Sequence, residues 1–257
     1  MMIKTLPDDL RLARTAGEFF ANQSQEAISQ RGYFSVVLAG GQTPANLYAL
    51  LTSEGFIHRI AWDKVHFFWG DERCVPPEHV DSNYNMARQY MLDHAPIPAE
   101  TLHRIQGERE PKAAAKAYEA ELRAFFGQER DPNSHQSAQN GLQPRFDLVL
   151  LGMGDDGHTA SLFPFSDALG ATDRWVVAHF AESVRAWRIT LTAQALNAAA
   201  NVIFMVTGAG KAETLREVIH GERDTERLPS QLIQPVDGKL VWLLDQGAAS
   251  RLETAQP

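Results

Sequence analysis

Short apolar segments alternate with helical segments along the whole chain, and this alternation constrains the fold more than any other feature. Nearly continuous apolar runs occupy residues 33–39, 64–70, 146–152 and 201–208, and each leads into a turn or a polar loop. Buried strands of a parallel sheet have this continuous apolar character. The sequence therefore predicts an α/β fold, with a mostly parallel central sheet and helices on both faces.

Helical periodicity and helix-forming composition place the covering helices between these strands. They are expected at residues 8–30, 44–51 with Pro44 as the first residue, 86–91, 111–126 and 211–221. Further strands are expected around residues 175–180, 188–192 and 239–245, and loops over 71–83 and 127–145. We expect a single domain over residues 1–257, with the polar, turn-rich segment 127–145 as a surface loop.

The net charge and the cysteine content limit the classes of binding partner and the compartment that we expect for this chain. The formal net charge is -8, and Lys and Arg are scattered, which disfavours nucleic acid or a membrane surface as the main partner. No long apolar run suggests export or membrane insertion, and Cys74 is the only cysteine, so we expect a cytoplasmic protein. No obligate protein partner is evident. A small anionic ligand would need a few local cations and backbone N–H groups.

Ligands of open α/β sheets bind beyond the carboxyl ends of the strands. This rule selects the four loops that follow Ala39, Gly70, Leu151 and Thr207. We expect the functional residues to come from these loops.

The loop after Leu151 reads GMGDDGHTASLFP and formally matches a dinucleotide-binding fingerprint. We reject that interpretation, because the match comes late in the chain and Pro164 interrupts the helix that should follow. Its glycines, Gly154 and Gly157 among them, instead allow the backbone to approach a ligand closely. Ser161 lacks the G-x-S-x-G context of a nucleophilic serine.

Asp156 and His158 are the candidate catalytic residues of this loop. An imidazole titrates near neutrality, so His158 could take a proton from a water that attacks a carbonyl, with Asp156 orienting the ring. The alternative is structural: Asp156 caps a following helix, and His158 satisfies a buried hydrogen bond. The pattern alone leaves both open.

The loops after Ala39 and Gly70 supply candidate anion ligands. Gly40, Gly41, Gln42 and Thr43 connect a strand end to a helix start, where free N–H groups and a hydroxyl can meet a phosphate. Alternatively, the glycines form a tight turn and Thr43 caps the helix. Arg73 can clamp a phosphate in a bidentate way, or form a surface ion pair with a neighbouring acid.

Lys211 lies at the start of a helix, where a cation is disfavoured unless an anion binds beside it; the alternative is a solvated lysine. The surrounding GAGK lacks the spacing of a phosphate loop, so no ATP site is implied. Arg188, before the strand ITLT, is a weaker candidate of the same kind. The histidines show no metal-ligand spacing, and we expect neither metal nor cofactor.

Taken together, these segments resemble the 6-phosphogluconolactonase family. The likeness runs through AGGQTP, HFFWGDERCVPPEHVDSNYNMA, LHRIQGE, FDLVLLGMGDDGHTASLFP, RITLT, VTGAGKAETL and VWLLD, and leaves out residues 127–145. GDER together with DGHTASLFP is the specific part. The wider fold group includes glucosamine-6-phosphate deaminase and ribose-5-phosphate isomerase.

The resemblance implies hydrolysis of 6-phospho-D-glucono-1,5-lactone to 6-phospho-D-gluconate, a step of the oxidative pentose phosphate pathway, without a metal. It implies His158 as the general base, and Arg73, Gly40–Thr43, Arg188 and Lys211 as ligands of phosphate and sugar hydroxyls. Backbone N–H groups of the loop from Gly152 to Gly157 would stabilise the oxyanion. The alternatives are a deaminase-like isomerase of the same fold and a non-enzymatic sugar-phosphate sensor.

Overall fold

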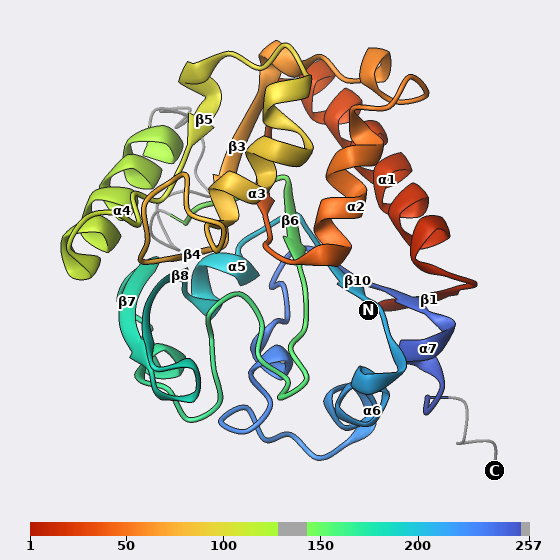
Figure 1. Ribbon diagram of the computed structural model, residues 1–257, viewed down its shortest axis with the longest axis vertical. Coiled ribbons are helices and arrows are strands. Elements are labelled where there is room, and N and C mark those ends of the chain that lie inside the picture. The colour runs from red at the N-terminus through yellow and green to blue at the C-terminus, as the bar shows by residue number, and fades with distance from the viewer. Residues whose placement is uncertain (128–142, 253–257) are drawn as a thin grey trace.

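The computed structural model describes residues 1–127 and 143–252, and its centre is a seven-stranded sheet (Figure 1). The strand order is β1-β10-β9-β6-β2-β3-β5, and every neighbouring pair is parallel. The strands are β1 Met2–Leu6, β2 Phe34–Leu38, β3 Val65–Trp69, β5 Leu102–His103, β6 Leu148–Leu151, β9 Asn201–Val206 and β10 Lys239–Asp245. The predicted fold class is confirmed.

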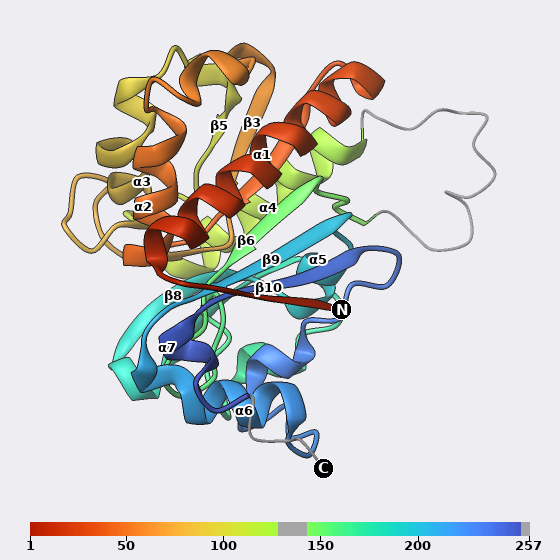
Figure 2. The ribbon, with the colours of Figure 1, turned by 90° about the vertical axis from the view of Figure 1, so that its right-hand side faces the viewer.

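Helices cover both faces of this sheet. In Figures 1 and 2, α1 and α2 lie on one side of the strands and α4 on the other. The helices are α1 Asp9–Arg31, α2 Gln42–Leu51, α3 Asn83–Tyr90, α4 Pro111–Gly127, α5 Ala193–Asn197, α6 Ala212–His220 and α7 Gln246–Ala249. Apolar residues of β2, β3, β6 and β9 are almost wholly buried, so the core lies between the two helical layers.

The bounds of α1 follow from its sequence. The Asp8 carboxylate accepts a hydrogen bond from the N–H of Arg11, which satisfies a first-turn donor. Gly32 ends the helix in the left-handed conformation at φ 85°, a geometry that glycine adopts without strain. Between them, Leu12, Ala16 and Phe20 recur at helical spacing and are fully buried.

A second sheet of three strands adjoins the carboxyl end of β3. Its antiparallel strands are β4 Asp71–Arg73, β8 Ala186–Leu191 and β7 Val176–Ala181, in the order β4-β8-β7. The predicted loop over 71–83 is therefore wrong for its first three residues. A charged triplet carries little strand propensity, and its pairing with β8 comes from tertiary context.

Other differences are smaller. Strands β1 and β5 were not predicted; β1 is largely exposed and β5 spans two residues, so neither carries a strong apolar signal. Helix α2 begins at Gln42, which makes Pro44 its third residue rather than its first. Residues 128–142 of the predicted loop lie outside the described residues. The single domain over 1–257 stays a prediction, and no described helix is long and apolar enough to span a membrane.

Candidate active site

The four loops at the carboxyl ends of the strands contact one another in a ring. Thr43, at the start of α2, shares a hydrogen bond of 2.8 Å between hydroxyls with Thr207, which follows β9. The loop after β9 then reaches the loop after β6, because the Lys211 ammonium donates to the carbonyl oxygen of Met153. The loops after β2, β9 and β6 are therefore in contact on this side.

Asp71, the first residue of β4 and two positions after the end of β3, closes the ring on the other side. Its Oδ2 accepts a hydrogen bond of 2.5 Å from Ser161 Oγ, which belongs to the loop after β6. Its Oδ1 accepts one of 3.1 Å from the side-chain amide of Asn83. Asn83 lies so close to Gly40 that a Cβ at that glycine would stand 2.0 Å from Asn83 Oδ1. The loop after β2 therefore needs a glycine at this point.

His158 and Asp156 form a hydrogen-bonded pair in the loop after β6. Oδ1 of Asp156 lies 2.6 Å from Nδ1 of His158 and also accepts the His158 backbone N–H at 3.1 Å. No helix follows this step, because the next residues form turns and an isolated bridge. The alternative in which Asp156 caps a helix is therefore wrong. The Asp156 carboxylate instead contacts the imidazole of His158 directly.

The contact with Asp156 fixes which nitrogen of His158 can act as a base. A carboxylate accepts a hydrogen bond, so Nδ1 carries the proton and Nε2 keeps its lone pair. Within residues 1–127 and 143–252, Nε2 has no hydrogen-bond partner. The ring packs against Phe163, with centroids 4.4 Å apart, and its side chain is 29% exposed. Nε2 is thus available to a water molecule.

The pKa of Asp156 reflects this pair. Burial raises it, but the hydrogen bonds from His158 and the electrostatic attraction to that side chain outweigh burial and hold the pKa of Asp156 below its ordinary value. Such a carboxylate contributes stability that is fully present above its unfolded pKa, near 4, and is lost as the pH falls through its folded pKa.

We therefore expect the pH to control the difference in stability between the wild type and Asp156→Asn. The wild type should have the higher midpoint of thermal unfolding at pH 6, and its advantage should shrink below about pH 4, where the carboxylate protonates. Thermal unfolding of both proteins at several pH values measures this. An advantage that persists undiminished to the lowest pH at which both fold would contradict the prediction.

Gly154 and Gly157 shape the loop around His158. A Cβ at Gly154 would stand 2.1 Å from His158 Nδ1 and 2.7 Å from Asp156 Oδ1, so the pair lies directly over this glycine. Gly157 has φ 82° and packs against Leu228. The N–H groups of Gly154 and Gly157 are already used, donating to the carbonyls of His158 and Gly154. These two amides are therefore not the oxyanion donors expected from the sequence.

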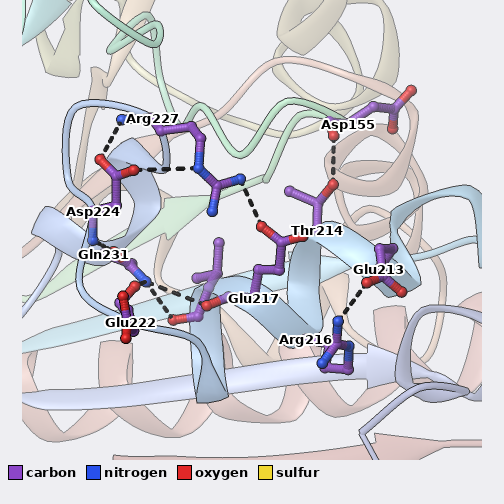
Figure 3. A network of polar contacts seen from close by, with 10 residues as sticks. Asp155, Glu213, Thr214, Arg216, Glu217, Glu222, Asp224, Arg227 and Gln231 are labelled. Carbon is purple, nitrogen blue, oxygen red and sulfur yellow. Dashed lines mark hydrogen bonds and ion pairs between the residues drawn. The ribbon is translucent and has the colours of Figure 1, made fainter.

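Helix α6 and the short helix η9, Pro229–Leu232, support the same loop from outside. Thr214 Oγ1 donates to the carbonyl of Asp155 at 2.7 Å, as Figure 3 shows, and Ser230 Oγ donates to that of Gly157 at 2.8 Å. Asp156 is thus flanked by two anchored carbonyls. In the same view, Arg227 contacts Glu217 of α6 and Asp224, which fastens the segment before η9 to the helix.

The turn before α2 presents unused backbone donors. Gly41, at φ 103°, precedes the helix, and no side chain caps it, so Thr43 does not act as a cap. In the described chain, the N–H groups of Gly40, Gly41, Gln42 and Thr43 have no acceptor. Gln42 points its amide to Asn46. A helix start with free N–H groups is a favourable anion site.

Arg73 and Arg188 face each other across the second sheet. They are register partners on β4 and β8, which places both side chains on one face. Arg73 donates to the carbonyl of Asp81 and, among the described residues, forms no ion pair, so the surface ion-pair alternative is wrong. Burial, and then the positive charge of Arg73, lower the pKa of Arg188. Two like charges held together favour a bound anion.

The observed environment of Lys211 differs from the one predicted from the sequence. It is the last residue of the short helix η8, Ala209–Lys211, and immediately precedes α6. Its ammonium already has a partner in the Met153 carbonyl, so a bound anion is not needed to explain its position. It still lies beside the His158 loop. Across the described residues, no three His, Cys, Asp or Glu side chains converge as metal ligands.

Comparison with known proteins places this arrangement in a family. The model of the family "Glucosamine-6-phosphate isomerases/6-phosphogluconolactonase" matches residues 7–242. The chain belongs to this family. Among its relatives, 6-phosphogluconolactonase of Nostoc sp. is 40% identical over 97% of this chain and 98% of its own. That of Haemophilus influenzae is 37% identical over 84% of this chain and 87% of its own.

Solved structures of the family agree in fold. 6-phosphogluconolactonase from Trypanosoma cruzi has a TM-score of 0.83 at 29% identity, covering 98% of this chain and 97% of that one. A monomeric glucosamine-6-phosphate deaminase has a TM-score of 0.78 at 19% identity, covering 98% and 100%. The deaminase shows the shared fold alone.

Sequence reasoning missed three supporting residues of this family member: Asp71, Glu72 and Asn83. Glu72 is buried and accepts hydrogen bonds from the N–H groups of Asn83 and Tyr84 at the start of α3. Burial raises its pKa against the opposing effect of these bonds. The available signal was two consecutive carboxylates at the end of a buried strand. Buried carboxylates need hydrogen-bond donors as partners, so two of them in succession indicate a structural hydrogen-bond network.

Proposed function

We propose that the chain hydrolyses 6-phospho-D-glucono-1,5-lactone to 6-phospho-D-gluconate, with His158 as the general base. The observation that carries the proposal is the His158–Asp156 pair, whose Nε2 is unoccupied and whose Nδ1 is held at 2.6 Å. The family membership and the lactonase relatives support the same reaction. A base near neutrality and positioned donors are what lactone hydrolysis requires.

In the proposed mechanism, Nε2 of His158 removes a proton from water as the water oxygen attacks C1 of the lactone. Asp156 stabilises the imidazolium that forms, because its carboxylate accepts a hydrogen bond from the Nδ1–H group of His158 throughout the reaction. The C1–O5 bond then breaks, and the imidazolium returns its proton to O5. The products are the carboxylic acid and the free C5 hydroxyl, so the enzyme ends in its starting state.

We assign oxyanion stabilisation to the turn before α2 rather than to Gly154 and Gly157. The N–H groups from Gly40 to Thr43 have no acceptor in the described chain, whereas those of Gly154 and Gly157 do. Free amides at a helix start favour negative charge. Lys211, which contacts the His158 loop through Met153, would bind a sugar oxygen nearby.

The Arg73–Arg188 pair is the proposed phosphate site. Both guanidinium groups emerge from one face of the second sheet, and neither is neutralised by an ion pair in the described residues. Their mutual repulsion is relieved when a phosphate dianion binds between them. This accounts for anion binding by a chain whose net charge is -8.

Arg188→Gln should raise KM for the phosphorylated lactone by about 10- to 100-fold, the cost of losing a charge-assisted hydrogen bond. Hydrolysis of unphosphorylated glucono-1,5-lactone provides the control, because its kcat/KM should be unchanged. Steady-state kinetics on both substrates measures the effect. An equal loss on both lactones would place Arg188 outside the phosphate site.

The reaction itself is tested with freshly prepared phosphogluconolactone, by following acid release at constant pH. We expect rapid hydrolysis above the spontaneous rate, and no ammonia from glucosamine 6-phosphate. Ammonia release without an effect on the lactone would instead assign the deaminase reaction.

We also propose a cytoplasmic location. Cys74 is the only cysteine of the chain, and burial raises the pKa of its thiol to about 11, which leaves it protonated and unreactive at neutral pH. A protein built without disulfides suits a reducing compartment.

A further inference from the structure

Strand β7 forms an open edge of the second sheet. Among the described strands it pairs only with β8, and Figure 1 shows it at the rim of the molecule, below α4. The Thr192 N–H donates to the Trp175 carbonyl, which sets the alternation of the ladder, so the backbone groups of Val177, His179 and Ala181 face β8. The backbone groups of Val176, Ala178 and Phe180 therefore point outward. Those of Ala178 and Phe180 have no partner in the described chain.

This edge lacks the features that normally protect a free strand. Its sequence, VVAHFA, contains no lysine, no proline and no acid. Natural edges are blunted by charged residues, proline, bulges or covering elements. At the far end, Phe180 and Trp187 pair edge to face with centroids 6.1 Å apart, and both are more than a third exposed. An unprotected edge that leads to exposed aromatic rings favours strand pairing with another chain.

A groove of about 710 Å³ runs between α4 and β7 and carries excess positive charge. Two of its cations are neutralised, Arg123 by Glu119 and Arg174 by Asp173. Lys112 and Lys116 are exposed, lie one helical turn apart, and form no ion pair in the described residues. In a chain with a net charge of -8, this local excess selects an acidic occupant.

The start of β7 already shows the kind of group that the edge accepts. The Glu119 carboxylate receives the N–H groups of Trp175 at 3.2 Å and Val176 at 3.3 Å. At this end of the groove, an acidic side chain of the protein itself therefore accepts the N–H groups that precede and begin β7. The next outward donors along the edge, at Ala178 and Phe180, are unused.

We propose that the α4–β7 groove binds an extended, acidic peptide segment of a partner protein. The segment adds as a strand to β7 by pairing with the outward groups of Ala178 and Phe180. Its acidic side chains face Lys112 and Lys116, and an apolar side chain contacts Phe180. A second copy of this chain fits less well, because its groove carries the same positive charge.

The test uses the whole protein and a fluorescein-labelled octapeptide that alternates glutamate and valine, with fluorescence anisotropy as the readout. We expect saturable binding, and a loss of at least about tenfold in affinity when lysine replaces glutamate in the peptide. Ala178→Pro removes one outward N–H without touching the pairing with β8, and should weaken binding by at least about tenfold. Ala178→Val keeps the N–H and should bind as the wild type does.

Lys116→Glu provides an independent variant should Ala178→Pro fail to fold, and it too should weaken binding of the glutamate peptide by at least about tenfold. Lactone hydrolysis should be unchanged in each folded variant, because neither residue belongs to the proposed active site. Three results would each overturn the proposal: no saturation up to about 1 mM peptide, equal binding of the lysine peptide, or unaltered binding by Lys116→Glu. Sedimentation showing dimers that Lys116→Glu leaves intact and Ala178→Pro dissolves would assign the edge to self-association instead.

Discussion

His158→Ala lowers kcat for phosphogluconolactone by about 10²- to 10⁴-fold, which is the usual contribution of a positioned general base. The variant removes Nε2, the unoccupied nitrogen of the pair with Asp156, and leaves the proposed phosphate site intact. KM should therefore change little. Initial rates of acid release, corrected for spontaneous hydrolysis, measure the effect.

The matched control is His94→Ala. Among the described residues, the exposed side chain of His94 has one hydrogen bond, to the Gln89 carbonyl, and it belongs to none of the four loops, so its loss should leave kcat unchanged. Circular dichroism should show the native helix content in both variants. If His158→Ala retained near-normal turnover while folded, another group would have to be the base.

Gly154→Ala should lower kcat by about 10²-fold, the cost expected when a catalytic group is displaced by about 1 Å. The added methyl would stand 2.1 Å from Nδ1 of His158 and 2.7 Å from Oδ1 of Asp156, so the pair must move. The variant removes no functional group. A large loss would therefore show that the position of His158, and not only its presence, supports turnover.

Gly152→Ala is the control for this experiment, because it adds the same methyl group to the same loop. No heavy atom outside the adjacent residues lies within 4 Å of the added Cβ, and the backbone there is not left-handed. Its kcat should match that of the wild type. A crystal structure of Gly154→Ala with an undisturbed His158–Asp156 contact would contradict the argument.

The central sheet was predictable because its strands are buried on both faces. β2, β3, β6 and β9 appear in the sequence as apolar runs with clear ends, and the rule for parallel sheets then located the four loops. β4 escaped prediction because a triplet of charged residues becomes a strand only through its partner β8. β1 escaped because most of its side chains face solvent.

The sequence proposes the residues of the candidate site but does not show their contacts. Sequence pattern selected Asp156 and His158, whereas only the coordinates distinguish an oriented imidazole from a helix cap. The amides of Gly154 and Gly157 illustrate the same limit, since their use within the turn depends on loop geometry. Asp71 and Ser161 meet across 90 positions of sequence, and no local signal encodes such a contact.

Strand β1 has a consequence for how the protein is made. Among the described residues its only partner is β10, with Met2 opposite Val241, so β1 is synthesised long before the strand that it pairs with. Contacts so distant in sequence form late and slow folding. During synthesis, β1 therefore remains without its partner until β10 emerges, and the nascent chain needs protection from wrong pairings throughout that interval. We expect chains that stop before β10 to be unable to complete the sheet.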